Sequence, residues 1–329
     1  MKTTSILLSA LLLGVVGCTS SIPEEQIDNE TDKYTVQFKG GISMTPQTKA
    51  GSEDMGNGVK ATIYAYENGK TDASVASHEY VAGSNGDLTG TKSYTMQLGK
   101  GTYDFYGVST NSTTSAPAFD QNSNTTTSAL SNNVDYLWVK TANKSISSSS
   151  TDQNIDLTFE RKAVKIAITI NSGTGIELTG WKDVGDNGVD ADAATITPPT
   201  ATGCVMTLST GVITPATACS GTANMKTENV SSKSSSVSYI MLPLIDGESP
   251  TPKVTLNVKV KVGTQITPEL RTYEANLSYP TGGFQSGNQY NFTATLNANG
   301  ITFTGAKVEV WTSQTNVDLT PTEPDQPVS

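Results

Sequence analysis

Short runs in which apolar and polar residues alternate recur along most of this chain. In the first run, at residues 34–38, apolar Tyr34, Val36 and Phe38 alternate with polar residues. A period of two places the apolar side chains on one face of a β-strand, whereas a helix repeats every 3.6 residues. We therefore expect a strand with one buried face, which ends at Gly40-Gly41.

The same kind of pattern continues to the end of the chain, with turn residues between the runs. Further strands are predicted at 59–66, 93–98, 103–108, 136–139, 155–159, 163–170, 175–181, 237–244, 254–262, 271–277, 289–296 and 301–311. Helical periodicity between the strands, which a doubly wound sheet needs, is not visible. Many short strands are typical of sandwiches. We expect an all-β fold of two tandem β-sandwich domains, 33–158 and 159–319, and a long surface loop at 109–133, where Ser, Thr and Asn dominate.

The beginning of the chain has the pattern of a bacterial lipoprotein signal. Lys2 is followed by an apolar run at residues 6–16, and the run ends in small residues before Cys18. This run is too short to remain as a spanning helix. We expect removal of residues 1–17 and lipidation of Cys18. Polar residues 18–32 then form a flexible tether, and 320–329 form a polar tail.

Composition excludes some classes of function. The formal net charge is −10, and it becomes one unit more negative when Lys2 leaves with the signal. The chain contains only two arginines, Arg161 and Arg271. This acidic balance argues against nucleic-acid binding and suits an extracellular subunit. The low aromatic content of 7% argues mildly against a cleft that stacks on sugars.

Two cysteines remain after lipidation, Cys204 and Cys219. In an oxidising compartment a disulfide between them is the simplest account, and it would stabilise the fold by about 3 kcal/mol in the chain-entropy model. Two buried free thiols are the alternative. A zinc site is a poor interpretation because the only histidine, His78, is far away in sequence.

Catalytic and metal-binding patterns are weak. His78 lies in a polar stretch, and the G-x-S-x-G motif of many hydrolases is absent from the sequence, so we interpret it as a surface histidine. Carboxylates also cluster around a glycine turn, where they could hold calcium, although the spacing differs from an EF-hand loop. These carboxylates are Asp183, Asp186, Asp190 and Asp192. A solvated turn is the preferred interpretation, and we expect neither an enzyme nor a cofactor.

Taken in order, several motifs resemble the fimbrillin family of Bacteroidales pilins, which are type V pilins made as lipoprotein precursors. The matching segments are Val15–Cys18, Tyr34–Phe38, Thr48–Gly51, Val59–Tyr66, Gly101–Tyr106, Phe159–Ile166, Gln289–Phe292 and the late Trp311. Each motif is weak alone, and their order carries the resemblance over nearly the whole mature chain. The resemblance implies that the two sandwich domains are transthyretin-like.

The resemblance also implies a route of maturation. A trypsin-like protease would cut after a basic residue in the loop beyond the first strand, here between Lys49 and Ala50. The family usually has arginine at this position, and Lys39 is a less exposed alternative. The first strand, within 33–49, would then leave together with the lipid on Cys18 and open a hydrophobic groove.

A segment from the C-terminal end of a neighbouring subunit would fill the groove as a donated strand. We expect this donor within residues 306–329. The candidate apolar residues are Val308, Val310, Val317 and Leu319.

The expected partners are therefore copies of the chain or other pilins, the maturation protease and, before cleavage, the outer membrane. The final location would be an extracellular fimbrium that supports adhesion. Three alternatives stay open: an uncleaved anchor subunit, a membrane-retained surface lipoprotein that binds glycan or calcium, and a secreted hydrolase.

Overall fold

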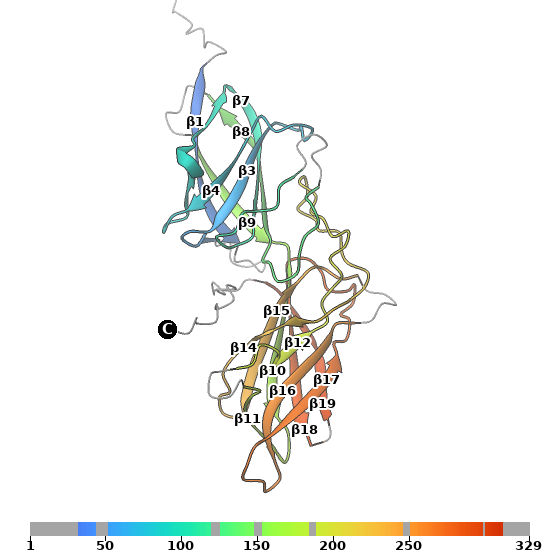
Figure 1. Cartoon of the computed structure of the whole chain (residues 1–329). Coiled ribbons are helices and arrows are strands. Elements are labelled where there is room, and N and C mark those ends of the chain that lie inside the picture. Colours follow the sequence, from blue (N-terminus) through green and yellow to red (C-terminus); the bar gives the residue numbers. More distant parts are fainter. Residues whose placement is uncertain are drawn as a thin grey trace, which may run out of the picture.

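The computed structural model describes residues 32–43, 52–119, 126–147, 153–183, 189–245, 251–298 and 300–311. In this part of the chain the regular elements are β-strands, apart from a short 3-10 turn at Thr91–Ser93. The prediction of an all-β protein is confirmed. None of the described residues forms a helix that is long and apolar enough to cross a bilayer. Figure 1 shows two β-rich parts placed end to end, which we call the N-terminal half (β1–β9) and the C-terminal half (β10–β19).

The strands of the N-terminal half belong to one sheet in the order β2-β1-β5-β4-β3-β7-β8-β9, and β6 also pairs with β1. Their bounds are β1 Lys33–Ser43, β2 Ser52–Asp54, β3 Lys60–Glu67, β4 Ala76–Ala82, β5 Asp87–Gly90, β6 Met96–Gly99, β7 Gly101–Ser109, β8 Leu137–Ile146 and β9 Gln153–Arg161. β1 additionally pairs in parallel with β9. This pairing joins β9, at one end of the strand order, to β1, next to the other end, so hydrogen bonding makes one closed, barrel-like sheet rather than two separate sheets.

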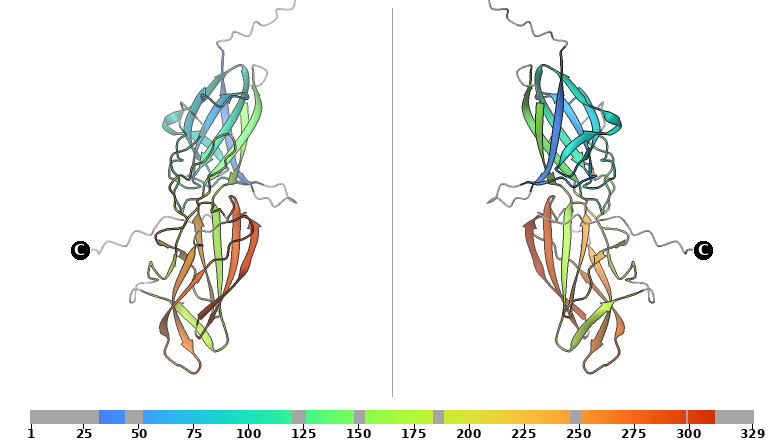
Figure 2. Two further views of the ribbon diagram at one scale, coloured as in Figure 1. Left: turned by 90° about the vertical axis from the view of Figure 1, so that its right-hand side faces the viewer. Right: turned by 90° about the vertical axis from the view of Figure 1, so that its left-hand side faces the viewer.

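The strands of the C-terminal half form two five-stranded sheets. The first has the order β14-β15-β10-β18-β19. In the second, β16 pairs with β11, β12 and β17, and β13 pairs with β12. Their bounds are β10 Val164–Ser172, β11 Ile176–Trp181, β12 Ala194–Ile196, β13 Ala223–Asn224, β14 Lys226–Thr227, β15 Ser234–Met241, β16 Lys253–Val262, β17 Glu269–Asn276, β18 Asn288–Asn297 and β19 Gly300–Val310. The side views in Figure 2 show the same end-to-end arrangement of the two halves.

Alternation decides which side chains form the two cores. In the N-terminal half, Ile63, Phe105 and Phe159 are fully buried members of one apolar cluster. In the C-terminal half, every second residue of β10 from Val164 to Ile170 is fully buried. Each buried side chain of this size stabilises the fold by about 1.5–3 kcal/mol, so the alternating strands supply most of the apolar burial.

The segment between β7 and β8 is not the surface loop that its composition predicts. Phe119 and Leu130 within it are buried. The backbone N–H groups of Thr127, Leu130 and Asn133 donate to carbonyls of the C-terminal half at 2.8–2.9 Å. The prediction is wrong because a few apolar residues, hidden among Ser, Thr and Asn, anchor the segment to the neighbouring half.

Some strands lack a sequence signal. β4 contains His78 and Glu79 and is mostly half-buried, so its pattern does not alternate clearly. β5 has four residues, and β12, β13 and β14 have two or three each. Strands this short depend on tertiary pairing rather than on local pattern, and they were not predicted.

Candidate functional site

The first strand, β1, is a central strand of the N-terminal half. Its inward side chains Val36, Phe38 and Ile42 are 3%, 4% and 8% exposed. The prediction of one buried face is confirmed for Val36 and Phe38, whereas Tyr34 is half-buried. The predicted end at Gly40-Gly41 is wrong, because both glycines remain extended and the strand continues to Ser43.

The two sides of β1 are held differently. On one side, residues Val36–Ile42 pair in parallel with seven consecutive residues of β9. On the other side, β1 pairs with three short strands in succession: β6 opposite Lys33–Val36, β5 opposite Phe38 and Lys39, and β2 opposite Gly41–Ser43. We call the place that β1 occupies between these strands the β1 slot.

The pairing on the short-strand side is interrupted near Gln37, where β6 gives way to β5. A cavity of about 750 Å³ lies along β1 at this point, and its lining includes Tyr80 and Tyr94. The ring of Phe38 packs edge-to-face on Tyr80 at 5.3 Å and on Phe105 at 5.4 Å. Burial raises the pKa of the Tyr80 hydroxyl above its ordinary value.

Gly40 and Gly41 mark the two narrowest levels of the β1 slot. A Cβ atom built at Gly40 would lie 3.3 Å from the Leu88 side chain, and one at Gly41 would lie 3.1 Å from Cβ of Ser52. Both distances are shorter than ordinary contacts between side chains. The slot therefore accepts large side chains at Val36 and Phe38 but only small residues at the next two levels.

The last described strand, β19, has a contrasting position at the edge of its sheet. Within the described residues, β18 is the only strand that pairs with it. None of its described side chains is buried, and Val308 is 47% exposed. Ile301 and Phe303 pack partly against the core, where the rings of Phe303 and Phe292 lie 6.4 Å apart.

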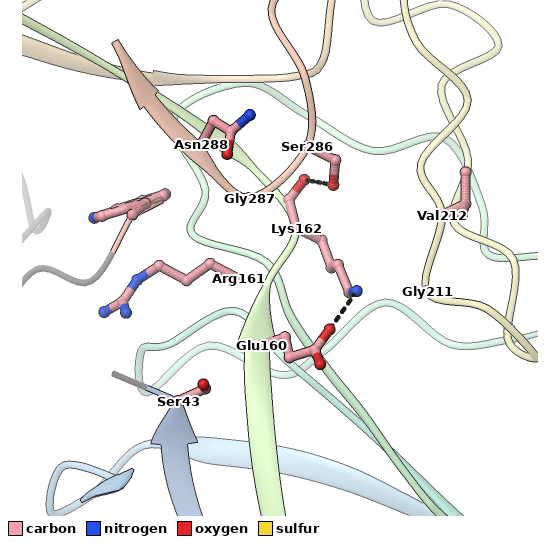
Figure 3. A pocket seen from close by; sticks show the side chains of 10 residues that line it. Ser43, Glu160, Arg161, Lys162, Gly211, Val212, Ser286, Gly287 and Asn288 are labelled. Atoms are coloured by element: carbon pink, nitrogen blue, oxygen red, sulfur yellow. Dashed lines mark hydrogen bonds and ion pairs between the residues drawn. The ribbon is translucent and has the colours of Figure 1, made fainter. Parts of the chain in front are cut away.

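The C-terminal ends of β1 and β19 meet where the two halves join (Figure 3). Ser43, Arg161 and Trp311 line a cavity of about 350 Å³ there. The Arg161 side chain bonds to Asp135 at 3.2 Å, and its guanidinium lies 4.9 Å from the centre of the Trp311 ring. Burial raises the pKa of the Asp135 carboxyl, whereas Arg161 beside it acts in the opposite direction. Charge pairing and ring stacking thus fix the junction.

The predicted disulfide is not formed in the structure, and Cys204 and Cys219 are free thiols. Cys204 is buried, and its thiol lies 3.6 Å from the Thr200 carbonyl oxygen. Cys219 is half-buried, and its backbone forms a bridge with Pro199. Burial raises the pKa of Cys204, and it raises the pKa of Cys219 to about 11. Both thiols are therefore in unreactive surroundings.

The described carboxylates of the candidate calcium cluster form ion pairs with lysines. Lys182 bonds to Asp192 at 2.7 Å and to Asp190 at 3.0 Å, and Lys259 bonds to Asp183. The Lys182 ammonium lowers the pKa of Asp190. No set of three metal-binding side chains occurs in the part of the chain that the structure describes. These contacts favour a turn held by ion pairs over a calcium site.

His78 is half-buried rather than on the open surface. Its ring stacks on Tyr94 at 3.9 Å, and Nε2 lies 2.9 Å from the Thr91 carbonyl oxygen. These contacts give it a packing role near the β1 slot.

The remaining predicted site residues lie outside the described residues. They are Cys18, Lys49, Ala50, Asp186, Val317 and Leu319. For Val310 the structure describes the backbone at the end of β19 and not the side chain. Sequence reasoning missed Gly40 and Ile42, although their period-two spacing after Phe38 was a visible signal.

The fold is shared with bacterial fimbrial and candidate cell adhesion proteins. A candidate cell adhesion protein from Bacteroides ovatus has a TM-score of 0.55 and 15% identity, covering 86% of this chain and 100% of its own. A fimbrial protein from Bacteroides vulgatus has a TM-score of 0.52 and 13% identity, with coverages of 85% and 100%. A candidate cell adhesion protein from Bacteroides uniformis has a TM-score of 0.51 and 17% identity, with coverages of 85% and 98%.

The sequence profile of fimbrillin-like proteins matches residues 48–311, which is well over half of the chain. The chain belongs to this fimbrillin-like family, and the resemblance noted from its motifs is confirmed. Curated proteins give no match to the sequence. Membership of the family supports a fimbrial or adhesion subunit at the cell surface, which is a structural rather than an enzymatic class of protein.

Proposed function

We propose that the protein is a fimbrial subunit that loses β1 by proteolysis and polymerises head to tail by accepting a strand from the next copy. One observation carries the proposal: the strand that closes the N-terminal sheet is also the first strand that the structure describes. A single cut in residues 44–51 would separate β1 from the rest of the fold, although its side chains form part of the core.

Loss of β1 is energetically costly, and this cost favours its replacement by a donated strand. Loss of β1 removes Val36, Phe38 and Ile42 from the core, at about 1.5–3 kcal/mol for each side chain. It also leaves backbone groups of β9 and of the short strands unpaired. A donated strand restores both kinds of contact. Because donor and acceptor surfaces differ, the joining is head to tail, and it gives a filament when the rotation between copies does not close a ring.

The maturation route follows the resemblance to pilins. Export as a lipoprotein attaches the precursor to the outer membrane through Cys18, and a trypsin-like protease cuts between Lys49 and Ala50. Lys39 is a poor alternative because it lies inside β1 and pairs with Asp54 at 3.4 Å. The C-terminal segment that includes Val308 supplies the donor.

We also propose that the two halves are two transthyretin-like domains. The boundary that the sequence predicts after residue 158 falls within β9, which continues to Arg161. Lys162 and Ala163 lie between β9 and β10, so we move the boundary there. Residues 320–329 remain a polar tail.

The test is the N-terminus of the protein on intact cells, determined by mass spectrometry. We expect Ala50 on polymeric protein and none of residues 18–49. A Lys49→Gln variant should keep the lipidated Cys18 and fail to polymerise, whereas a matched Lys39→Gln variant should mature normally. A polymer that still carries lipidated Cys18 would refute the proposal, and an unpolymerised lipidated protein would favour the anchor or the surface lipoprotein.

A further inference from the structure

The inward pattern of β1 occurs a second time, in β19. Residues 36–42 read V-Q-F-K-G-G-I, and residues 301–307 read I-T-F-T-G-A-K. Both have an aliphatic residue, a phenylalanine and a glycine at alternate positions, with polar residues between them and a small residue after the glycine. We infer that residues 301–307 of a neighbouring copy replace residues 36–42 in the β1 slot, position for position and in the same direction. This inference rests on the proposed strand donation.

The dimensions of the β1 slot match this register. Ile301 would take the place of Val36, and Phe303 would take the aromatic site of Phe38 between Tyr80 and Phe105. Gly305 would then lie at the level of Gly40, where an added Cβ would crowd the Leu88 side chain at 3.3 Å. Among alternating residues of the C-terminal segment 300–329, only this register offers two large apolar residues followed by a glycine.

β19 is also suited to leave its own sheet. It is an edge strand with the same length as β1, 11 residues each. Its outward residues Thr302 and Thr304 are exposed, as Gln37 and Lys39 are in β1. Release of β19 breaks pairing with one strand and withdraws the buried Trp311 ring from Arg161, whereas insertion makes pairing on two sides. The exchange therefore gains backbone hydrogen bonds.

The direction of insertion follows from the two ends of the slot. The Ser43 end faces the C-terminal half of the same chain, beside Arg161 and Trp311 (Figure 3). The Lys33 end lies at the pole of the N-terminal half that is remote from the C-terminal half (Figure 1). A donor enters at this remote end while its N-terminal side remains attached to its own copy. It must therefore run as β1 does, parallel to β9.

The place where β19 begins agrees with this route. Asn297 and Gly300 pair at the hairpin between β18 and β19, whereas Asn288 and Val310 pair near the junction. A released β19 would therefore extend from the end of the C-terminal half that is remote from the junction. In a head-to-tail filament this end approaches the Lys33 end of the next copy.

Two positions differ between the strands. Ala306 would replace Gly41, where its Cβ would lie 3.1 Å from Cβ of Ser52, so Ser52 must shift by a few tenths of an ångström. Lys307 would replace Ile42. Ile42 is the last inward residue before the junction cavity, which Glu160 also lines. A lysine stem can cover apolar surface while its ammonium reaches a polar cavity. In this register Val308 and Val310 would lie at the junction, and Val317 and Leu319 would lie beyond the slot.

Disulfide cross-linking tests both the register and the direction. On β9, Asn154 and Thr158 are exposed and lie opposite Gln37 and Gly41. Each test chain carries one acceptor change, Asn154→Cys or Thr158→Cys, and one donor change, Thr302→Cys or Ala306→Cys. Cys204→Ala and Cys219→Ala remove the native thiols, and the chains are matured by trypsin before oxidation. Thermal unfolding of each monomer verifies that it folds.

The matched pairs, 154 with 302 and 158 with 306, should give covalent ladders, and the crossed pairs should give none. Ladders from the crossed pairs alone would mean insertion in the opposite direction and would overturn the inference. An additional donor chain with Asp318→Cys tests the later segment, and ladders from it alone would overturn the register. Filaments seen by electron microscopy without any cross-link would also overturn it, whereas chains that mature and never polymerise would refute the proposed function itself.

A size substitution gives an independent test. Gly305→Val should strongly reduce polymerisation because a valine at the Gly40 level of the slot would collide with the Leu88 side chain, whereas the matched outward change Thr304→Val should leave polymerisation intact. As an acceptor, the matured Gly305→Val chain should still take a peptide of residues 300–310 with the native sequence. Normal polymerisation of Gly305→Val would contradict the register.

Discussion

β1 and β19, the first and last described strands, have the same length and a similar order of side chains but different surroundings. β1 has strand neighbours on both sides and three side chains below 9% exposure. β19 has one strand neighbour and no described side chain that is buried. The comparison teaches that the order of side chains along a strand decides which position in a sheet it fits. The number of neighbouring strands and the burial of its side chains decide how strongly it is bound there.

Removal of β1 should give the largest contrast, which is between the two halves of the molecule. A matured chain that begins at Ala50 should lose hydrogen-exchange protection in β9, β5 and β6, because the whole stability of such a unit is about 5–15 kcal/mol. The strands β10 and β16 should keep their protection. A peptide of residues 33–43 should restore the lost protection, and a peptide of the same composition in scrambled order is the control. Equal loss in both halves would break the comparison.

Substitution of one phenylalanine in each strand should give a smaller contrast. Phe38→Ala leaves a cavity between Tyr80 and Phe105 and should cost about 3–5 kcal/mol. Phe303→Ala removes a half-buried ring and should cost clearly less. Urea unfolding of the uncleaved chain measures both values. Equal losses would show that β19 is held as firmly as β1.

The native thiols can report on the C-terminal half alone. Burial raises the pKa of Cys219 to about 11, so little thiolate exists at pH 8, and both thiols should react slowly with a thiol reagent. They should stay slow in the chain that begins at Ala50, because both lie in the C-terminal half. Denaturant should make both react fast. Rapid reaction of the matured native chain would mean that loss of β1 also loosens the C-terminal half.

The smallest effect is expected at the exposed valine of β19. Val308→Ser should change stability by within about 0.5 kcal/mol, because the side chain is 47% exposed. Val36→Ser in β1 should destabilise much more, because it places a hydroxyl in the core without a partner. Thermal unfolding compares the two variants, and a similar melting temperature for both would contradict the contrast.

The sequence predicts strands well where one face is buried against a long neighbour. β10, β16 and β18 show this, because alternation and burial coincide in each of them. It fails for β4, whose residues are mostly half-buried, and for short strands such as β12, which are created by tertiary pairing. The sequence also misplaces the end of β1. Two consecutive glycines, Gly40 and Gly41, indicate a turn, but they occur equally where a strand passes through a narrow slot.

Prediction of the candidate site has a similar limit. The buried face of β1 is readable at Val36 and Phe38, because it depends on local pattern. The exposure of β19 is not readable, because it depends on the absence of a second neighbour in its sheet. The junction around Arg161 and Trp311 is also not readable, since these residues are 150 positions apart.

The connections between the halves have a mechanical consequence. The chain passes from β9 to β10 through Lys162 and Ala163, and the segment between β7 and β8 crosses the same boundary through the hydrogen bonds of Thr127, Leu130 and Asn133. Two tethers that act side by side share a tensile load and resist bending at the boundary. A fibre made of such subunits would be stiff within each copy, and its compliance would lie at the joints between copies.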